Sequence, residues 1–291
     1  MKKAFIQLHI AVFLAGFTAV LGRLIQLNEG LLVWYRLLIT VLVLAGMLYY
    51  KKEFVALPTK ALLKMTGVGG IIAFHWVMFY GSVKYGNISV ALVCLSAAGF
   101  FSALLEPFIL RKPFVWQELL LGLLAIIGIY IIFDFHPQFA QGIVYGILAA
   151  IGSAIFPIFN KQLVTVYSPR TLTFYELLGG FVILSVLLPF YLQVTDAPYY
   201  IPTITDTIWL LVLAVICTVL CFDLQLKALQ KISAFTINLM YNLEPLYGII
   251  LAFLFFGESK NFHGAFYIGV LLIMMAIVLQ MVRLTPKKPR L

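Results

Sequence analysis

The sequence predicts an all-α integral membrane protein, with ten transmembrane helices arranged as two inverted five-helix repeats. Of its 291 residues, 63% are hydrophobic and only 11% are charged. About a quarter of the residues of a soluble domain are charged. The mean hydropathy is +1.06. This composition indicates a chain that lies mostly in lipid, rather than one that folds around a large soluble core.

Ten apolar runs have roughly the 17–25 residues that cross a bilayer as a helix. They are separated by short links, of which the longest, TDAPYYIPTITD, is rich in turn residues. The predicted spans are residues 4–22, 30–50, 62–83, 88–110, 114–133, 142–160, 171–193, 206–227, 233–256 and 263–283.

The basic residues predict how these spans are oriented. If the N-terminus is cytoplasmic and the spans alternate, cytoplasmic segments hold 16 of the 20 lysines and arginines. Because a lysine and arginine excess marks the cytoplasmic side, we expect both termini there, in a multi-pass inner or plasma membrane protein. This distribution explains the net charge of +9 without nucleic acid as a partner. The three cysteines lie in apolar runs with no metal-ligand spacing, so we expect neither a disulfide framework nor a cofactor.

The chain repeats itself. VWYRLLITVLVL around Arg36 matches TFYELLGGFVIL around Glu176, and GNISVALVCL from Gly86 matches QKISAFTINL from Gln230. We therefore divide the chain into a first repeat, residues 1–136, and a second, residues 137–291. Five spans is an odd number, so the second repeat must cross the membrane in the opposite sense. Inverted repeats are typical of secondary transporters, with a binding site near the midplane; the alternative is a duplicated bundle that transports nothing.

Arg36 and Glu176 occupy equivalent positions in the two repeats, each about 9 Å deep at 1.5 Å per residue. Neither charge should face lipid. Arg36 is predicted to bind an anionic group such as a carboxylate, and Glu176 a cationic group or a proton. Alternatively, each side chain extends to the nearer interface.

Glu244 lies about eleven residues into the ninth span, near the midplane, and Pro245 follows it. Proline has no N–H, so it frees a backbone carbonyl one turn earlier, which requires a polar cavity or protein partners at that depth. We predict a site for a proton or an amine at Glu244, with Tyr241 and Asn242 lining it. A structural hydrogen bond at a helix kink is the alternative.

His75, Trp76 and Tyr80 lie in the middle of the third span. The histidine could relay protons, and the aromatic rings could line an amphipathic pocket; the alternative for all three is packing. GxSxG, HExxH and P-loop patterns are absent from the sequence. Uphill transport would therefore draw on an ion or substrate gradient.

Three segments carry a family resemblance: WYRLL at 34–38, HWVMFYGSVKYGNISVAL at 75–92, and ISAFTINLMYNLEPLYGIILAFLFFGE at 232–258. With them the whole chain resembles an EamA-type member of the drug/metabolite transporter superfamily. The resemblance implies ten helices in two inverted EamA repeats and export of small metabolites, amino acids or drugs. One departure is that Arg111-Lys112 replaces the usual glycine-glutamate of the first repeat. We therefore predict no symmetric role for Glu258, which we interpret as an outer helix-end residue.

These observations predict a secondary active transporter that exports small amphipathic metabolites (amino acids, amines or drugs) by alternating access. We expect it to lie in the lipid bilayer as a homodimer and to use protons as the coupling ion. We do not expect it to be an enzyme. An obligate exchanger of sugar-type anions is the first alternative, although one buried arginine is little for binding phosphates. The second is a membrane-embedded structural subunit or enzyme. The predicted substrate-binding residues are Arg36, His75, Trp76, Tyr80, Glu176, Tyr241 and Asn242, and the predicted proton-coupling residue is Glu244.

Overall fold

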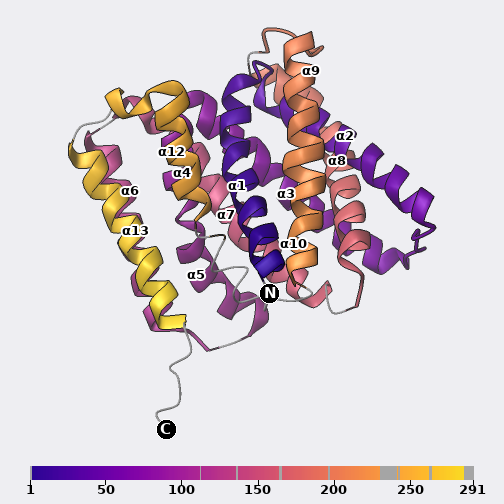
Figure 1. Ribbon diagram of the computed structural model, residues 1–291, viewed down its shortest axis with the longest axis horizontal. Coiled ribbons are helices and arrows are strands. Elements are labelled where there is room, and N and C mark those ends of the chain that lie inside the picture. The colour runs from indigo at the N-terminus through magenta and orange to yellow at the C-terminus, as the bar shows by residue number, and fades with distance from the viewer. Residues whose placement is uncertain are drawn as a thin grey trace.

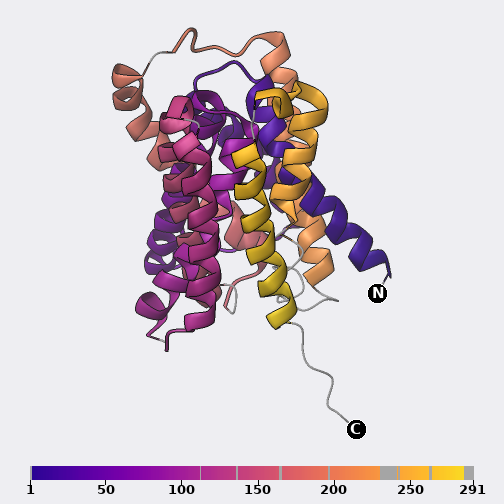
Figure 2. The same ribbon diagram turned by 90° about the vertical axis from the view of Figure 1, so that its left-hand side faces the viewer.

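The computed structural model describes residues 2–111, 113–135, 137–163, 166–195, 197–229, 241, 243–261 and 264–284, a part of the chain that contains helices and no strand. The helices form one bundle, and α1 begins at the same end of it at which α13 finishes (Figures 1 and 2). The first half contains α1 (Lys2–Leu24), α2 (Glu29–Lys51), α3 (Thr59–Tyr85), α4 (Ile88–Leu95), α5 (Ala98–Leu110) and α6 (Trp116–Phe135). The second contains η1 (Pro137–Phe139), α7 (Ala140–Leu163), α8 (Pro169–Val194), α9 (Ile204–Leu211), η2 (Val212–Leu220), α10 (Cys221–Leu229), α12 (Glu244–Phe256), η3 (Glu258–Asn261) and α13 (Gly264–Leu284).

Among the described residues, seven helical stretches are long and apolar enough to cross a membrane. They are Lys3–Leu24, Glu29–Lys51, Thr59–Tyr85, Ile88–Leu110, Ala140–Asn160, Arg170–Val194 and Ile204–Leu224. Shorter apolar helices at Trp116–Ile131, Glu244–Phe256 and Gly264–Ala276 lie within the other three predicted spans. The prediction of a helical, multi-pass membrane protein is confirmed. The count of ten helices and the inversion remain predictions.

Two predicted spans are less regular than their apolar runs indicated. Residues 88–110 form two helices, α4 and α5, because the chain makes a turn at Ser96 and Ala97. In the eighth span, the middle segment η2 is a π-helix, which is rare and frequently found at functional sites. Hydropathy carries no information on either feature, because both leave the apolar character of the run unchanged.

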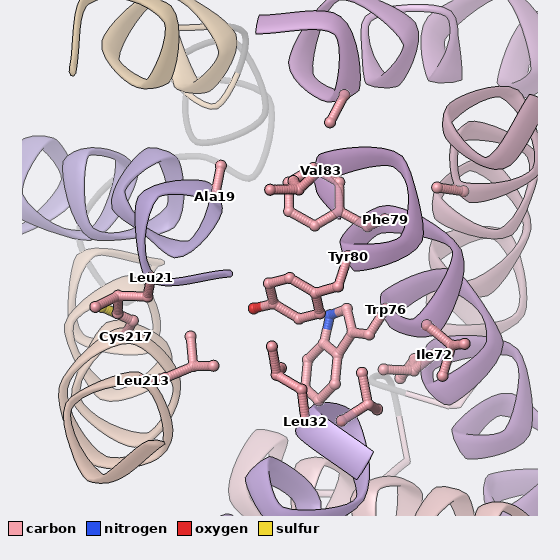
Figure 3. Close-up of a cluster of buried hydrophobic side chains, with 14 of the residues drawn as sticks. Ala19, Leu21, Leu32, Ile72, Trp76, Phe79, Tyr80, Val83, Leu213 and Cys217 are labelled. Carbon is pink, nitrogen blue, oxygen red and sulfur yellow. The ribbon is translucent and has the colours of Figure 1, made fainter. Parts of the chain in front are cut away.

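Helix α3 is the centre of the packing. It contacts α1, α2, α4, α7 and α8, so it joins the two halves of the chain. α6 and α13 pack on each other at one side of the bundle, and α2 and α8 at the opposite side (Figure 1). Large side chains from α3, including Phe79 and Tyr80, fill the main buried cluster together with Leu21 of α1 and Leu213 of η2 (Figure 3).

Several helix contacts between the two halves occur twice, with the roles of the first and the second half exchanged. α3 packs against α7 and α8, while α9, η2 and α10 together pack against α1 and α2. Likewise α4 and α5 pack against α7, and α12 packs against α1. The contacts of α2 with α8 and of α6 with α13 each join corresponding spans. Each half thus makes the same set of contacts with the other.

Glu258 connects the end of the second half to the first. It follows Gly257, whose φ of +60° ends α12 in the left-handed conformation, as glycine commonly does. The buried carboxylate accepts hydrogen bonds from Ile88 N (3.1 Å), Ser89 N (2.9 Å) and Ser89 Oγ (2.7 Å). The two backbone donors are free N–H groups at the start of α4, where the helix dipole favours a negative charge. Glu258 is therefore a cap across the two halves, which its sequence position did not indicate.

The α3–α8 contact requires glycine on both sides. A Cβ on Gly69 would overlap the carbonyl oxygen of Glu176, and it would lie 2.6 Å from Gly180 N. Both are backbone atoms, which cannot rotate away. The two helices approach this closely only because neither carries a side chain at the point of contact.

We predict that Gly69→Ala lowers the unfolding temperature of the protein in detergent by several degrees. Forcing two packed helices apart costs about 1–3 kcal/mol. Gly67→Ala is the matched control, because a Cβ on Gly67 meets nothing within 4 Å and alanine is favoured over glycine in a helix by up to about 1 kcal/mol. Equal unfolding temperatures for the two variants would contradict the proposed close contact.

Candidate functional site

Arg36 and Glu176 occupy the same place in their helices. Arg36 lies seven residues after the first residue of α2, and Glu176 seven after the first residue of α8. Each helix begins with a side-chain cap: Asn28 accepts from Gly30 N, and Ser168 from Thr171 N. The caps fix where each helix starts, and so how deep each charged residue lies. Both side chains are buried, each with 4% of its surface exposed.

The Arg36 guanidinium is held by aromatic and hydroxyl groups. Its Cζ lies 3.6 Å from the centroid of the Trp76 ring. Nη1 donates to the Tyr80 hydroxyl (2.8 Å), and Nε and Nη2 donate to Thr218 Oγ1 (3.1 and 3.0 Å). A cation stacked on a desolvated aromatic ring is stabilised by about 2 kcal/mol. The side chain is therefore directed into the bundle and not toward an interface.

None of these partners neutralises the Arg36 charge. In the described part of the chain, ion pairs join Arg170 to Glu53 and Asp223 and join Arg283 to Glu118, and none includes Arg36. A buried charge without a counter-charge is costly. Arg36 is therefore a buried positive charge whose hydrogen-bond partners among the described residues are all neutral.

Thr218 was not among the predicted site residues. It lies in the π-helical segment η2, and its hydroxyl donates to Leu213 O, five residues earlier (2.8 Å). Because that donor is used, Oγ1 presents acceptor electron pairs to Arg36. A threonine within an otherwise apolar run was the available signal, but threonines are also common in such runs for packing.

Tyr80 reaches Arg36 because α1 leaves room for its ring. Tyr80 projects from α3 toward the side where Leu21 of α1 and Leu213 of η2 lie, and the Trp76 ring lies between Tyr80 and Leu32 of α2 (Figure 3). A Cβ on Gly22 would overlap the Tyr80 ring. Arg36, Trp76 and Tyr80, all predicted from the sequence, thus lie together.

His75 faces a different neighbour from Trp76. Its Nδ1 is 2.7 Å from the carbonyl oxygen of Ala149 in α7. A carbonyl only accepts, so Nδ1 carries the hydrogen of this bond. The ring lies beside Phe79 and Phe156. This placement joins α3 to α7, and the structure does not bring His75 into contact with Arg36.

Glu176 forms a second polar group, with Asn160 of α7. Asn160 Nδ2 donates to Glu176 Oε2 (3.1 Å). Glu176 Oε1 and Asn160 Oδ1 are buried, and neither has a hydrogen-bond partner among the described residues. Asn160 was not predicted as a site residue.

Glu244 is the first residue of α12, and Pro245 occupies the first turn. The proline therefore lies in the first turn of α12, where a helix tolerates it because no N–H donor is needed there. α1 approaches closely here, since a Cβ on Gly16 would lie 2.9 Å from Glu244 O. Arg36 acts on Glu244 electrostatically. Tyr241 OH lies 3.7 Å from Cys221 Sγ in α10; Asn242 lies outside the described residues.

A network of hydrogen bonds closes the upper end of the bundle in Figure 1, around the start of α9. Asp206 accepts from Gln26 N (2.8 Å), Tyr199 OH (2.6 Å) and Thr203 Oγ1 (2.8 Å). Burial and the hydrogen bond to Asp206 raise the pKa of Tyr199 to about 12, so it remains a donor at neutral pH. Tyr191 OH donates to the buried Glu29 (2.6 Å). These bonds join the α1–α2 link to the second half.

The other end of the bundle contains a pocket between α2, α8 and η2–α10. Arg170 on its rim contacts Glu53 and Asp223 at 3.2 Å each, and these side chains are partly exposed to solvent. The pocket begins two turns beyond Arg36 on α2, and the same helix face carries the buried Thr40 between them. Its lining residues are Leu44, Met47, Leu48, Lys51, Glu53, Arg170, Thr173, Val219, Phe222 and Asp223.

The model of the EamA-like transporter family matches two stretches of the chain, residues 2–134 and 140–282. The chain belongs to the EamA-like transporter family. This member of the family is therefore a multi-pass membrane protein of transporter type, as the sequence resemblance implied.

Named relatives agree with the family. The chain is 28% identical over 284 residues to the uncharacterized transporter YetK of Bacillus subtilis, covering 92% of this chain and 83% of the relative. It is 28% identical over 231 residues to the S-adenosylmethionine uptake transporter of Rickettsia prowazekii, covering 78% and 75%. A solved crystal structure matches with a TM-score of 0.66 over 98% of this chain and 99% of that one, at 12% identity, which shows a shared fold.

We predict that Thr218→Val lowers the unfolding temperature of this EamA family member, whereas Thr218→Ser does not. Valine has nearly the same shape but leaves Arg36 Nε and Nη2 without their acceptor, and an unsatisfied buried donor costs about 1–3 kcal/mol. Serine keeps the hydroxyl. The check is thermal unfolding of the three purified proteins; a valine variant as stable as wild type would show that Arg36 does not depend on Thr218.

Proposed function

We propose that the chain is a secondary active transporter of small amphipathic metabolites that carry a carboxylate, amino acids and their derivatives foremost. The observation that carries this proposal is the buried Arg36 guanidinium, which has aromatic and hydroxyl partners but no carboxylate partner among the described residues. A guanidinium offers paired N–H groups that match a carboxylate. A substrate carboxylate would neutralise the charge, and the Trp76 and Tyr80 rings would contact its apolar part.

Alternating access of two inverted five-helix repeats is the proposed mechanism. Equivalent contacts between the halves support an inverted repeat. α3 packs on α7 and α8, and the α9–α10 segment packs in the same way on α1 and α2. The family match to two successive stretches supports it as well. Arg36 contacts α3 of its own half and η2 of the other, so rocking one half against the other would change its surroundings. We further propose that both termini are cytoplasmic, as the basic residues predict.

Export is the direction predicted from the sequence, and import is the second candidate. Relatives named as S-adenosylmethionine uptake transporters favour import. S-adenosylmethionine has an amino-acid carboxylate and an adenine ring, which are the kinds of group that Arg36 and the aromatic residues would bind. Direction and substrate class therefore require separate measurements.

Glu244 is the proposed proton-coupling residue. It is partly buried at the start of α12, within electrostatic reach of Arg36 and close to α1. Substrate carboxylate bound at Arg36 would neutralise the nearby positive charge and so favour a proton on Glu244. The two events would then be linked, as coupled transport requires.

The test of substrate class is counterflow in liposomes with labelled amino acids, S-adenosylmethionine and amines without a carboxylate. For Arg36→Gln we predict a half-saturation concentration about 10- to 150-fold higher for carboxylate substrates, because a charged hydrogen bond contributes about 1.5–3 kcal/mol. The half-saturation concentration of the amines, which lack the group that Arg36 would bind, should change little.

Arg23→Gln is the matched control, because Arg23 is exposed at the end of α1. It removes the same charge from the same half without touching the site. If Arg23→Gln and Arg36→Gln have equal effects, or if Arg36→Gln weakens all substrates alike, Arg36 is not the carboxylate ligand. Running each substrate from both sides of the membrane identifies the direction.

The coupling role predicts that Glu244→Gln abolishes accumulation driven by a pH gradient. Glutamine cannot release a proton, so transport in this variant should not respond to the gradient. Glu118→Gln, which removes a partly exposed carboxylate paired with Arg283, is the control and should keep the response. Full gradient-driven accumulation in Glu244→Gln would exclude the coupling role of Glu244.

A further inference from the structure

The Glu176–Asn160 pair is a polar group deep in the second half that the proposed substrate contacts do not use. Glu176 has 4% of its surface exposed, and its backbone carbonyl lies against Gly69 of α3. One hydrogen bond, from Asn160 Nδ2 to Oε2, joins the two side chains (3.1 Å). The remaining oxygens, Glu176 Oε1 and Asn160 Oδ1, are both buried and both lack a partner among the described residues.

Both unpartnered atoms are acceptors when Glu176 is ionised. A carboxylate has no donor, and the amide oxygen has none either. Two buried acceptors without donors would leave the pair under-satisfied, at a cost of about 1–3 kcal/mol for each group. One proton on Oε1 changes this balance, because it converts one of the two unpartnered acceptors into a donor.

We propose that Glu176 and Asn160 form a proton-binding site, in which Glu176 is a neutral acid in the conformation of this structure. The acid accepts from Asn160 Nδ2 through Oε2 and donates through its O–H toward Asn160 Oδ1. A sodium ion or a substrate amine bound to the ionised carboxylate would also leave the site neutral, and the experiment below separates these occupants from the proton. The proton leaves the pair neutral.

The surroundings of Glu176 favour the neutral form, because the described charged groups near α8 are engaged elsewhere. His75 is hydrogen-bonded to Ala149 O, and Lys84 donates to Ile25 O. Arg36 is held by its aromatic and hydroxyl partners, and Arg170 by Glu53 and Asp223. The remaining lysines nearby are exposed: Lys51, Lys60 and Lys64. Tyr175, next to Glu176, donates to Val55 O. The side chain of Lys161, next to Asn160, lies outside the described residues. Thus no described cation supplies a counter-charge that would hold Glu176 ionised.

The role of this proton rests on the proposed transport function, although its presence does not. Glu176 is sealed where α8 meets α3, at the close contact of Gly69 with Gly180. Its proton can exchange with water only when α8 and α7 separate from α3. Proton release would then accompany the same movement that alternates access, at a site separate from Glu244.

The test is infrared spectroscopy of the purified protein at neutral pH, because protonated and ionised carboxyl groups absorb at different frequencies. We expect Glu176→Gln to lose absorption in the protonated carboxyl band relative to wild type, with the carboxylate band unchanged. Glu118→Gln, at the partly exposed ion pair, should instead lose carboxylate absorption. Loss of carboxylate absorption in Glu176→Gln would overturn the proposal.

A second variant protects the test against misfolding of the first. Asn160→Ala keeps Glu176 but removes its hydrogen-bond partner, so the protonated band should shift in frequency; an unchanged band would show that it does not arise from this pair.

Unfolding temperatures are measured in parallel with sodium and with choline. A sodium-dependent rise in wild type that Glu176→Gln lacks would identify a sodium site and overturn the proton. The spectra need no transport, so inactivity in liposomes would count against the proposed function alone.

Discussion

The buried guanidinium of Arg36 is the constraint on which the centre of this bundle depends. A cation at this depth must be surrounded by groups that accept its hydrogens or face it with aromatic electrons. Trp76 and Tyr80 supply this from α3, and Thr218 supplies it from η2. Each partner has its own requirement: Gly22 leaves space for the Tyr80 ring, and a π-helical turn gives the Thr218 hydroxyl a carbonyl to donate to. The site thus explains local features of three helices that hydropathy alone does not require.

The two halves place groups of opposite character at equivalent positions. Arg36 cannot lose its charge, and it is surrounded by neutral partners from both halves, Trp76 and Tyr80 of α3 and Thr218 of η2. Glu176 can lose its charge by taking up a proton, and its partner is a single amide. The sequence repeat is therefore preserved in backbone position but not in chemistry. One fixed charge and one titratable group at equivalent positions would suit the proposed transporter. Such a protein would bind a substrate and a proton at different places, and one movement of the two halves would carry both.

The sequence predicted the helices and the Arg36, Trp76 and Tyr80 group, because charged and aromatic residues stand out in an apolar run. It did not identify Thr218, Asn160 or the capping role of Glu258. Thr218 and Glu258 take their significance from partners far away in the chain, such as Arg36 for Thr218, 182 residues earlier, whereas Asn160 pairs with Glu176, 16 residues later. His75 was predicted beside Trp76, yet successive residues on a helix point in different directions, and His75 faces α7. A helix kink at Pro245 was one alternative from the sequence; in the structure α12 begins at Glu244 and the proline lies in its first turn.

The two ends of the bundle are held by interactions of different strength. At the end that the basic residues assign to the outside, buried carboxylates join the halves: Asp206 to the α1–α2 link, Glu29 to Tyr191, and Glu258 to α4. At the other end, Arg170 contacts partly exposed partners beside a pocket and Arg283 contacts Glu118, and such ion pairs contribute about 0–1 kcal/mol. Hydrogen bonds to a charged group contribute about 1.5–3 kcal/mol each. Breaking these carboxylate contacts therefore costs more than breaking the ion pairs, so under the proposed alternating access the end with the ion pairs would open first.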